Sequence, residues 1–243
     1  MHLSPPACTH NLIKSLTSAT LYRMDVETLA CDAAVRIRDD ILAGRLRAGD
    51  RLKLADLGRR YGLGLTPVRE ALRELQGERL VEIVPNCGAS VRRLDRAAVD
   101  DIFEVRMALE GMTARRAARV ATPAAIAELH EVHERLVRHV ATSEHRAALE
   151  ANRDFHRAIA IAGGNGEALA VLERQWRIIP ALWKAVDYAP SRLPQVIADH
   201  VQLLEALIAG DADGAEAIAV AHVAKARREL LARWPEGEAV RNA

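Results

Sequence analysis

Four residues in the C-terminal half have side chains that can bind a divalent metal ion: Asn152, His156, His200 and His222. Asn152 and His156 are four residues apart, which places them on one face of a helix. His200 and His222 lie in the middle of two further predicted helices. If these helices pack together, three imidazoles and an amide oxygen converge. This donor set suits zinc, with nickel or manganese as alternatives.

A second interpretation of these residues stays open, because the chain has nine histidines and chance spacings arise easily among so many. A single histidine is commonly a surface residue or a hydrogen-bonded structural residue. We assign four others to the exposed faces of their helices: His130, His133, His139 and His145. The spacing alone is therefore weak evidence for a metal site.

Another candidate site lies on a predicted helix that begins at Thr66 and Pro67 and ends near residue 78. Threonine is a good helix cap, and proline suits the first helical position, where an N–H would have no partner. One side of the helix is apolar, and the other carries Arg69, Arg73 and Gln76. Such side chains can contact DNA phosphates or guanine. The alternative is a solvated helix face on which acidic neighbours offset the arginines.

The elements around this helix predict a winged helix-turn-helix. A longer helix over residues 26–43 and a short one over 54–61 precede it, and the segment 47–50 is expected to be a turn. Two β-prone segments follow, at 80–84 and 89–93, separated by a turn that contains Gly88. Two such segments around a turn are typical of a hairpin, here a wing beside the helix-turn-helix.

From Asp95 onward the hydrophobic pattern is helical throughout, with glycine and proline only at breaks. We expect helices at 96–120, 123–142, 144–162, 166–187, 193–209 and 212–233. About six helices joined by short turns predict an antiparallel bundle. The expected fold class is mainly α, with three parts: a flexible tail (1–23), a winged helix-turn-helix domain (24–94) and a helical domain (95–234).

Composition and charge agree with this division. Aromatic residues make up only 3% of a chain that is half apolar, which favours helices packed through aliphatic side chains. Residues 31–93 carry 13 basic against 9 acidic residues, whereas 94–243 carry 19 against 22. A basic part joined to an acidic part indicates that only the first meets a polyanion.

The sequence has no apolar run long enough to cross a bilayer and no pattern of a secretory signal near its start. Its three cysteines, Cys8, Cys31 and Cys87, lack the spacing of metal ligands. We therefore expect a cytoplasmic protein without a membrane partner.

The N-terminal motifs resemble the GntR family of transcription regulators. The matching segments are Ala48-Gly49-Asp50-Arg51-Leu52, the run from Thr66 to Leu75 (TPVREALREL) and the turn Pro85-Asn86-Cys87-Gly88. The resemblance implies that the TPVREAL helix enters DNA and that the wing meets the minor groove. It places Thr66 and Arg69 on DNA, together with Asn86 and Gly88 in the wing, and our interpretation of the helix adds Arg73.

One departure from the GntR pattern concerns the operator. The family usually has serine or threonine followed by arginine before TPVREAL, whereas this chain has Gly64-Leu65. An arginine there commonly contacts guanine in relatives, and such a contact contributes roughly 1–3 kcal/mol of discrimination. Leu65 therefore implies weaker DNA binding or an unusual operator.

The C-terminal motifs resemble the FCD effector domain of the FadR subfamily. They include Asn152-Arg153-Asp154-Phe155-His156, the turn Gly164-Asn165, the pair Asp199-His200, and His222. In metal-binding members one aspartate and three histidines hold the ion, and here Asn152 stands where aspartate is usual. A neutral amide is a poorer ligand for a dication than a carboxylate, which implies lower affinity or metal binding together with an acidic ligand.

The same resemblance implies a small organic acid as effector, with Arg106 at a position that can bind the ligand carboxylate through parallel N–H donors. The alternative for Arg106 is an ion pair with Glu110, four residues further along. Trp176, Trp183 and Tyr188 could line the pocket, although aromatic side chains are more often part of a core.

The predicted function is that of a homodimeric regulator which binds double-stranded DNA and whose affinity for its operator is controlled by a small carboxylate, bound with a divalent metal in the bundle. Two alternatives stay open: a carboxylate-sensing regulator without metal, and a metal-dependent helical-bundle enzyme. We do not expect an enzyme, because no carboxylate is well placed as a general base. Asp154 and Asp199 lie too near His156 and His200 in sequence to share their helix faces.

Overall fold

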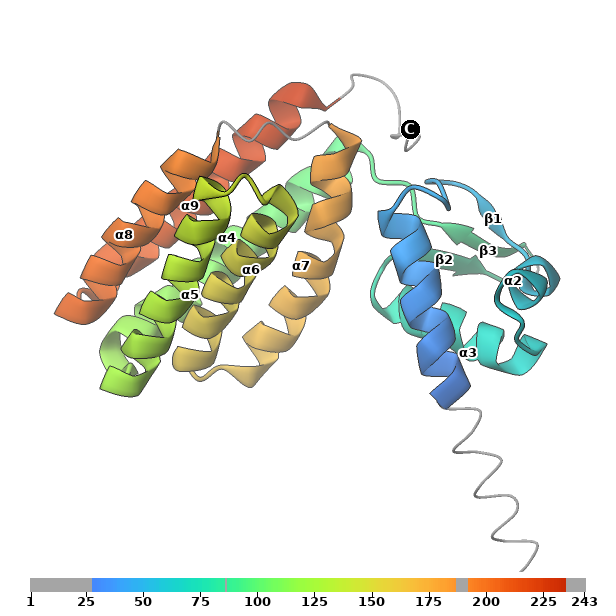
Figure 1. Ribbon diagram of the computed structural model, residues 1–243, viewed down its shortest axis with the longest axis horizontal. Helices are drawn as coiled ribbons and strands as arrows, with labels where there is room; N and C mark the ends of the chain where they lie inside the picture. The colour runs from blue at the N-terminus through green and yellow to red at the C-terminus, as the bar shows by residue number, and fades with distance from the viewer. Residues whose placement is uncertain (1–27, 86, 187–191, 235–243) are drawn as a thin grey trace, which may run out of the picture. The chain divides into compact units, whose positions relative to one another are not determined.

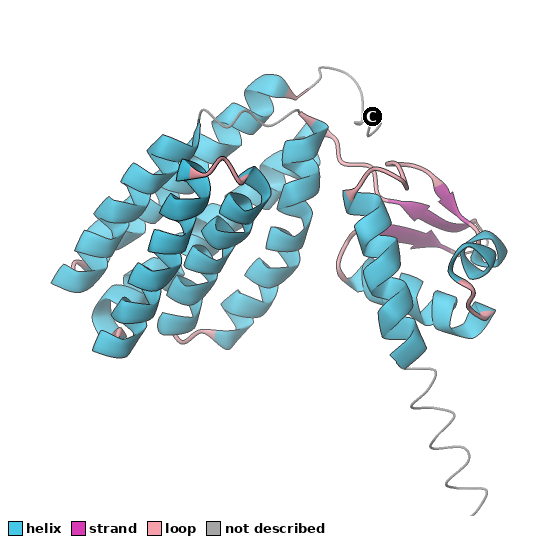
Figure 2. Cartoon of the chain, in the orientation of Figure 1, coloured by secondary structure: helices cyan, strands magenta, loops and turns pink. Residues whose placement is uncertain are grey.

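The computed structural model describes residues 28–85, 87–186 and 192–234. The chain divides into two compact units between Arg92 and Arg93. Among the described residues every strand belongs to the first unit, and the described part of the second unit is helical apart from turns (Figure 2). The expected fold class is confirmed: mainly α, with a winged helix-turn-helix followed by a helical bundle.

The first unit combines helices with a small antiparallel sheet of strand order β1-β3-β2 (Figure 1). Its elements are a helix over residues 28–42, β1 (Arg51–Leu52), α2 (Leu54–Tyr61), α3 (Leu65–Gly77), β2 (Val81–Val84) and β3 (Gly88–Val91). The apolar side of α3, with Val68, Leu72 and Leu75, is buried as the sequence pattern predicted. It forms a core with Ile37 and Leu57, so the opposite side of α3 faces outward.

The turn between α2 and α3 differs from the expected one. Gly62 ends α2 in the left-handed conformation at φ 69°, which glycine adopts without steric cost. Gly64, and not Thr66, caps α3, which begins at Leu65. The expectation that Thr66 caps the helix was wrong because Gly64 already has the extended backbone of a cap. Pro67 still lies in the first turn, where proline is tolerated.

The strand β1 was missed, because the sequence after the turn at 47–50 showed no strand pattern. It exists through pairing: Arg51 lies opposite Ser90 and Leu52 opposite Ala89 on β3. β2 and β3 form the expected hairpin, with Val81 opposite Val91 and Val84 opposite Gly88. Gly88 has φ 89° at the start of β3, a conformation that favours glycine.

The second unit is a bundle of long helices (Figure 1). Their bounds are α4 (Arg96–Val120), α5 (Pro123–Ala141), α6 (His145–Ala162), α7 (Gly166–Ala185), α8 (Leu193–Ala209) and α9 (Ala212–Arg233). α4 packs along α9 and also contacts α6, α7 and α8, while α5 lies against α6 and α8. Side chains of Asp95, Thr122 and Asp211 cap α4, α5 and α9, as is typical of these residue types.

Close helix packing brings the site-bearing helices together. A Cβ on Gly111 of α4 would lie 2.7 Å from Val220 Cγ2 on α9, and one on Gly163 would lie 2.6 Å from the carbonyl oxygen of Thr113. Glycine therefore permits contact distances that any side chain would prevent. Over the described part of the chain, no helix combines the length and apolarity needed to span a membrane.

Candidate functional site

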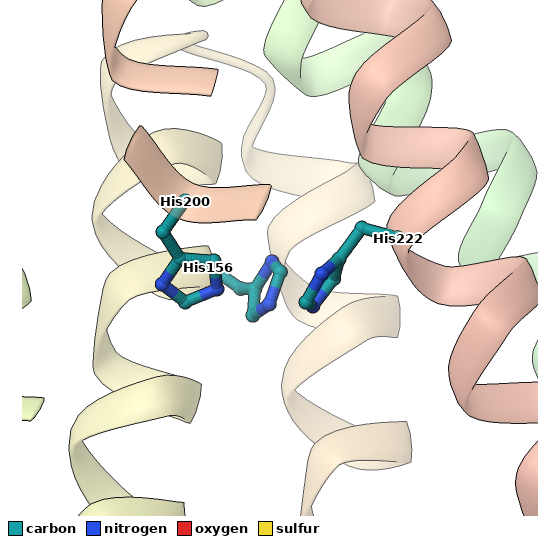
Figure 3. Close-up of side chains that lie close together, drawn as sticks. All are labelled: His156, His200 and His222. Carbon is teal, nitrogen blue, oxygen red and sulfur yellow. The ribbon is translucent and has the colours of Figure 1, made fainter. Parts of the chain in front are cut away.

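Three of the predicted metal ligands meet in the interior of the bundle. His156 on α6, His200 on α8 and His222 on α9 are all buried, and their nearest ring nitrogens lie within 4.8 Å of one another (Figure 3). The ring centroids are 5.0–5.2 Å apart. His200 follows His156 by 44 residues, and His222 follows His200 by 22. The fold nevertheless brings the three imidazoles into one common space.

The fourth predicted ligand, Asn152, lies on α6 one turn before His156. Its amide oxygen Oδ1 is buried and accepts no hydrogen bond from any described residue. A buried amide oxygen without a donor carries a free-energy cost. Asn152 therefore has an acceptor atom available for a ligand.

His156 is oriented by a carboxylate that sequence reasoning did not assign to the site. Its Nδ1 lies 3.0 Å from Oε2 of Glu110, on α4. The other oxygen of Glu110 accepts hydrogen bonds from Arg106 Nε at 2.8 Å and from Trp176 Nε1 at 3.1 Å. Burial opposes ionisation of Glu110, but Arg106 and His156 together lower its pKa far below the usual range. The carboxylate is therefore ionised and holds Nδ1 of His156.

A second carboxylate orients His222 in the same way. Nδ1 of His222 lies 3.1 Å from Oδ2 of Asp199, on α8. Oδ1 of Asp199 accepts hydrogen bonds from Lys225 Nζ at 2.6 Å and Gln195 Nε2 at 2.9 Å. Burial opposes ionisation of Asp199, but the hydrogen bonds from His222, Lys225 and Gln195 lower its pKa well below the usual range. Asp199 thus holds the ring of His222, and not that of its sequence neighbour His200.

His200 has no such partner. Its ring stacks on Phe155 with centroids 4.0 Å apart, and neither ring nitrogen makes a hydrogen bond to a described residue. Burial, followed by the charges of His222 and His156, lowers the pKa of His200 well below its ordinary value. Burial also lowers the pKa of His222 to about 4, against the opposing effect of the hydrogen bond that His222 donates to Asp199. Both rings are therefore neutral near pH 7, which is the state that binds metals.

The donor set fits a divalent metal ion. A carboxylate that holds one imidazole nitrogen while the other binds the ion is the usual arrangement around histidine ligands. Nε2 of His156 and both nitrogens of His200 are buried without a hydrogen-bond partner among the residues that the structure describes. Nitrogens on one tetrahedral zinc ion lie about 3.4 Å apart, as ligand distances of about 2.1 Å require. The present separations are within 4.8 Å, so the rings would have to approach one another by up to about 1.4 Å to hold one ion.

The expectation that His133 is exposed was wrong. Its exposed fraction is 8%, and its ring centroid lies 5.9 Å from that of His200. His133 shares the buried face of α5 with Leu129, Val132 and Leu136. This apolar spacing was the signal that could have placed it inside. His130 and His145 are exposed.

Arg106 is buried in the ion pair with Glu110, which was one of the two interpretations of its sequence position. Its guanidinium carbon also lies 4.9 Å from the ring centroid of Phe103. Within the described parts of the chain, its hydrogen bonding involves Nε alone. Trp176 and Trp183 are buried, and Trp176 reaches the site through Glu110. Tyr188 lies outside the described residues.

The predicted DNA-contacting residues of α3 lie on its exposed side. Thr66, Arg69 and Arg73 are exposed, and Arg73 forms an ion pair with Glu70 at 2.9 Å. Arg69 makes neither an ion pair nor a side-chain hydrogen bond with any residue that the structure describes, so its guanidinium is available. Gly88 is exposed at the start of β3. Asn86, the other predicted wing residue, lies outside the described residues.

Comparison with known proteins assigns both units. Residues 29–91 match the family described as bacterial regulatory proteins, gntR family. Residues 101–225, which include the histidine cluster and both orienting carboxylates, match the FCD domain. The two matches fall in the first and the second unit, respectively.

Curated relatives are transcription regulators and not enzymes. The chain is 30% identical to a probable D-xylose utilization operon transcriptional repressor of Paenarthrobacter nicotinovorans, over 85% of this chain and 90% of the relative. It is 29% identical to the regulator McbR of Escherichia coli, over 73% of this chain and 81% of the relative.

Solved structures agree with this assignment. A structure of E. coli McbR/YncC matches 83% of this chain and 96% of its own, with a TM-score of 0.69 and 25% identity. A putative GntR regulator from Rhodococcus has a TM-score of 0.68 at 20% identity and shares the fold. The chain therefore belongs to the GntR family of bacterial transcription regulators and carries an FCD domain.

Proposed function

We propose that this regulator binds DNA as a homodimer and that a small organic acid, bound together with a divalent metal ion in the FCD bundle, controls its affinity for the operator. The observation that carries the sensing role is the group of three buried histidines whose ring nitrogens lie within 4.8 Å of one another. Its place of action would be the bacterial cytoplasm, where the chromosome lies.

On the DNA side, α3 would lie in the major groove. Arg69 has no competing ion pair among the described residues, and Thr66 and Arg73 flank it on the exposed side. The wing, with Asn86 and Gly88, would contact the minor groove. A two-fold dimer would present two copies of α3 to half-sites about one helical turn apart.

On the sensing side, His156, His200 and His222 would hold the metal, with Asn152 as a further oxygen donor. The buried ring nitrogens of His156 and His200 without hydrogen-bond partners among the described residues support this role. Each lowers the stability of the metal-free protein, and a nitrogen that binds the ion gains a partner. Nitrogen donors favour zinc, and nickel is a second candidate; manganese, which prefers oxygen ligands, is the weakest. The metal would supply a positive charge and open positions for an anionic ligand.

The charges around the site favour an anionic effector. Arg106 balances Glu110, and Lys225 balances Asp199. His200, His222 and Asn152 are neutral, so they would not compensate the two positive charges of a dication bound in this buried space. An uncompensated buried charge is costly. A carboxylate on the effector would reduce this cost, and Arg106 lies beside the cluster as a second cation that could attract it.

Metal and effector would then bind cooperatively. Each would supply a charge that balances the other, so the metal should bind more tightly when a carboxylate is present. The carboxylate should in turn bind more tightly when the metal is present, by the same factor. Ligand binding would change the affinity for the operator by no more than the difference between the ligand's affinities for the two arrangements of the DNA-binding units.

The sensing role can be tested by calorimetric titration of chelator-treated, untagged protein with zinc or nickel, with and without acetate. We expect one metal per chain, tighter binding in acetate, and loss of binding in His156→Asn and His200→Ala. His130→Ala, which removes an exposed histidine, is the matched control and should bind normally. Binding of carboxylates with no metal uptake would instead support the metal-free sensor.

The DNA-binding role can be tested with DNA from the upstream region of the protein's own gene. Arg69→Ala should weaken binding and reduce the dependence of log K on log salt by about one unit, as expected when one phosphate contact is lost. Arg146→Ala, a change at an exposed arginine on α6, should have no effect. Absence of salt-dependent binding to any such DNA would contradict the proposal.

A further inference from the structure

Leu65 is an exposed apolar residue at the beginning of α3. Half of its surface, 51%, is open to solvent, although leucine is among the residues most often buried. The other side of the residue lies against α2: a Cβ added to Gly58 would be 3.8 Å from Leu65 Cδ2. The side chain is therefore supported from within its own unit and presents its remaining surface outward.

Leu65 shares its helix face with the residues proposed to meet DNA. Arg69 follows it by four residues and Arg73 by eight, and all three are exposed. The opposite face, with Val68, Leu72 and Leu75, is buried in the core. An apolar residue thus begins a line of cationic side chains on the same side of α3.

The position on the helix selects the kind of partner. In helix-turn-helix proteins the N-terminal residues of the second helix contact base edges in the major groove. The major-groove edges of the bases carry hydrogen-bonding groups, and the C5-methyl group of thymine is the apolar exception. Leucine has no hydrogen-bonding atom in its side chain, so thymine is the base that it can favour by contact.

We propose that Leu65 is a specificity-determining residue that contacts the C5-methyl group of a thymine in each half-site. The inference rests on the proposed placement of α3 in the major groove and goes beyond it by naming the base. Arg69 would contact the neighbouring backbone or base and hold the helix at this depth.

The expected effect follows from the size of the group. Covering one methyl group contributes a factor of about four to an equilibrium constant. Replacing the contacted thymine by deoxyuridine, which lacks only this methyl group, should therefore weaken binding about fourfold when one half-site is changed. Changing both half-sites should weaken it roughly 16-fold, because the two contacts are independent.

The experiment begins with selection of bound sequences from a random duplex library by the full-length protein. Each thymine of the selected operator is then replaced singly by deoxyuridine, and binding is measured for the wild type and for Leu65→Ala. We expect one position per half-site at which deoxyuridine weakens binding by the wild type but has no effect on Leu65→Ala. In a further selection, Leu65→Arg should prefer guanine there, since arginine binds the guanine edge.

Val35→Ala is the matched control, because Val35 is also exposed but lies on the helix of residues 28–42. This variant should retain the full effect of deoxyuridine. An unchanged thermal unfolding curve for Leu65→Ala establishes that the exposed position is not needed for folding.

The inference is overturned if deoxyuridine has no effect at any thymine, or if the same loss appears in Leu65→Ala. Either result leaves salt-dependent operator binding, and with it the proposed function, intact. If the wild type selects no sequence and binds no DNA, the placement of α3 and the inference about Leu65 fail together.

Discussion

The two candidate sites use charge in opposite ways. On α3 the cationic side chains are exposed, and Arg69 has no acidic partner among the described residues. Inside the bundle, Arg106 is buried and paired with Glu110 at 2.8 Å. An exposed cation acts at a distance on a large polyanion at little cost to stability. A buried cation is stable only with its partner, and a small ligand that reached it would bind away from competing water.

The largest expected effect comes from removing one partner of the buried pair. Glu110→Gln leaves Arg106 charged and unpaired and should lower the free energy of unfolding of the bundle by about 3–5 kcal/mol. Glu70→Gln, which breaks the exposed pair with Arg73, should cost at most about 1 kcal/mol. Urea unfolding followed by tryptophan fluorescence measures Glu110→Gln, because all three tryptophans lie in the bundle. Circular dichroism, which also reports on the first unit, measures Glu70→Gln. Similar losses in the two variants would remove the distinction between the sites.

Metal binding should stabilise one unit only. At a free zinc concentration 100 times the Kd, the bundle should gain about 2.7 kcal/mol, and chelator should reverse the gain. Thermal unfolding followed by tryptophan fluorescence should shift, while the transition of the DNA-binding unit should stay in place. A zinc-induced shift of both transitions, or one retained in His200→Ala, would argue against a site confined to the histidine cluster.

The position of α3 depends on a close contact in the helix-turn-helix. A Cβ on Gly58 would lie 2.8 Å from the carbonyl oxygen of Leu63, so Gly58→Ala forces the backbone to move and should cost about 1–3 kcal/mol. Gly77→Ala, at the end of α3, meets nothing within 4 Å and should stabilise by up to about 1 kcal/mol. Circular dichroism of the unfolding transition of the DNA-binding unit measures both, and an unchanged free energy of unfolding in Gly58→Ala would show that this turn is adaptable.

The smallest effect concerns the stability that the metal-free protein loses through the unpartnered nitrogens of His200. His200 has two buried nitrogens without partners among the described residues. His200→Leu removes them and should raise the free energy of unfolding of chelator-treated protein by about 1–2 kcal/mol, while zinc should no longer stabilise the variant. A destabilised His200→Leu would mean that packing on Phe155 outweighs the unpaired nitrogens.

Much of the fold could be predicted from the sequence because local signals mark the helix ends. The expected bounds 96–120, 193–209 and 212–233 coincide with α4, α8 and α9, where Asp95 and Asp211 provide side-chain caps. The two-residue strand β1 could not be predicted in this way, because it depends on pairing with β3, about 38 residues away in sequence.

The site was predicted less completely, for a related reason. The three histidines could be chosen from their places on helices, but the carboxylates that orient them could not. Glu110 contacts His156 from 46 residues away, and Asp199 contacts His222 instead of the adjacent His200. Such pairs depend on how the helices are rotated against each other. The burial of His133 could have been predicted, since it follows Leu129 by four residues and precedes Leu136 by three.

The contact between Glu110 and His156 has a mechanical consequence. Glu110 lies within α4, the first helix after the boundary between the units, which begins at Arg96. Glu110 follows Arg96 by 14 residues, a distance of about 21 Å along the continuous helix. A ligand that pulled or released Glu110 would therefore act on one continuous helix, and that helix begins directly after residues 92–95, the segment that follows the last strand of the DNA-binding unit.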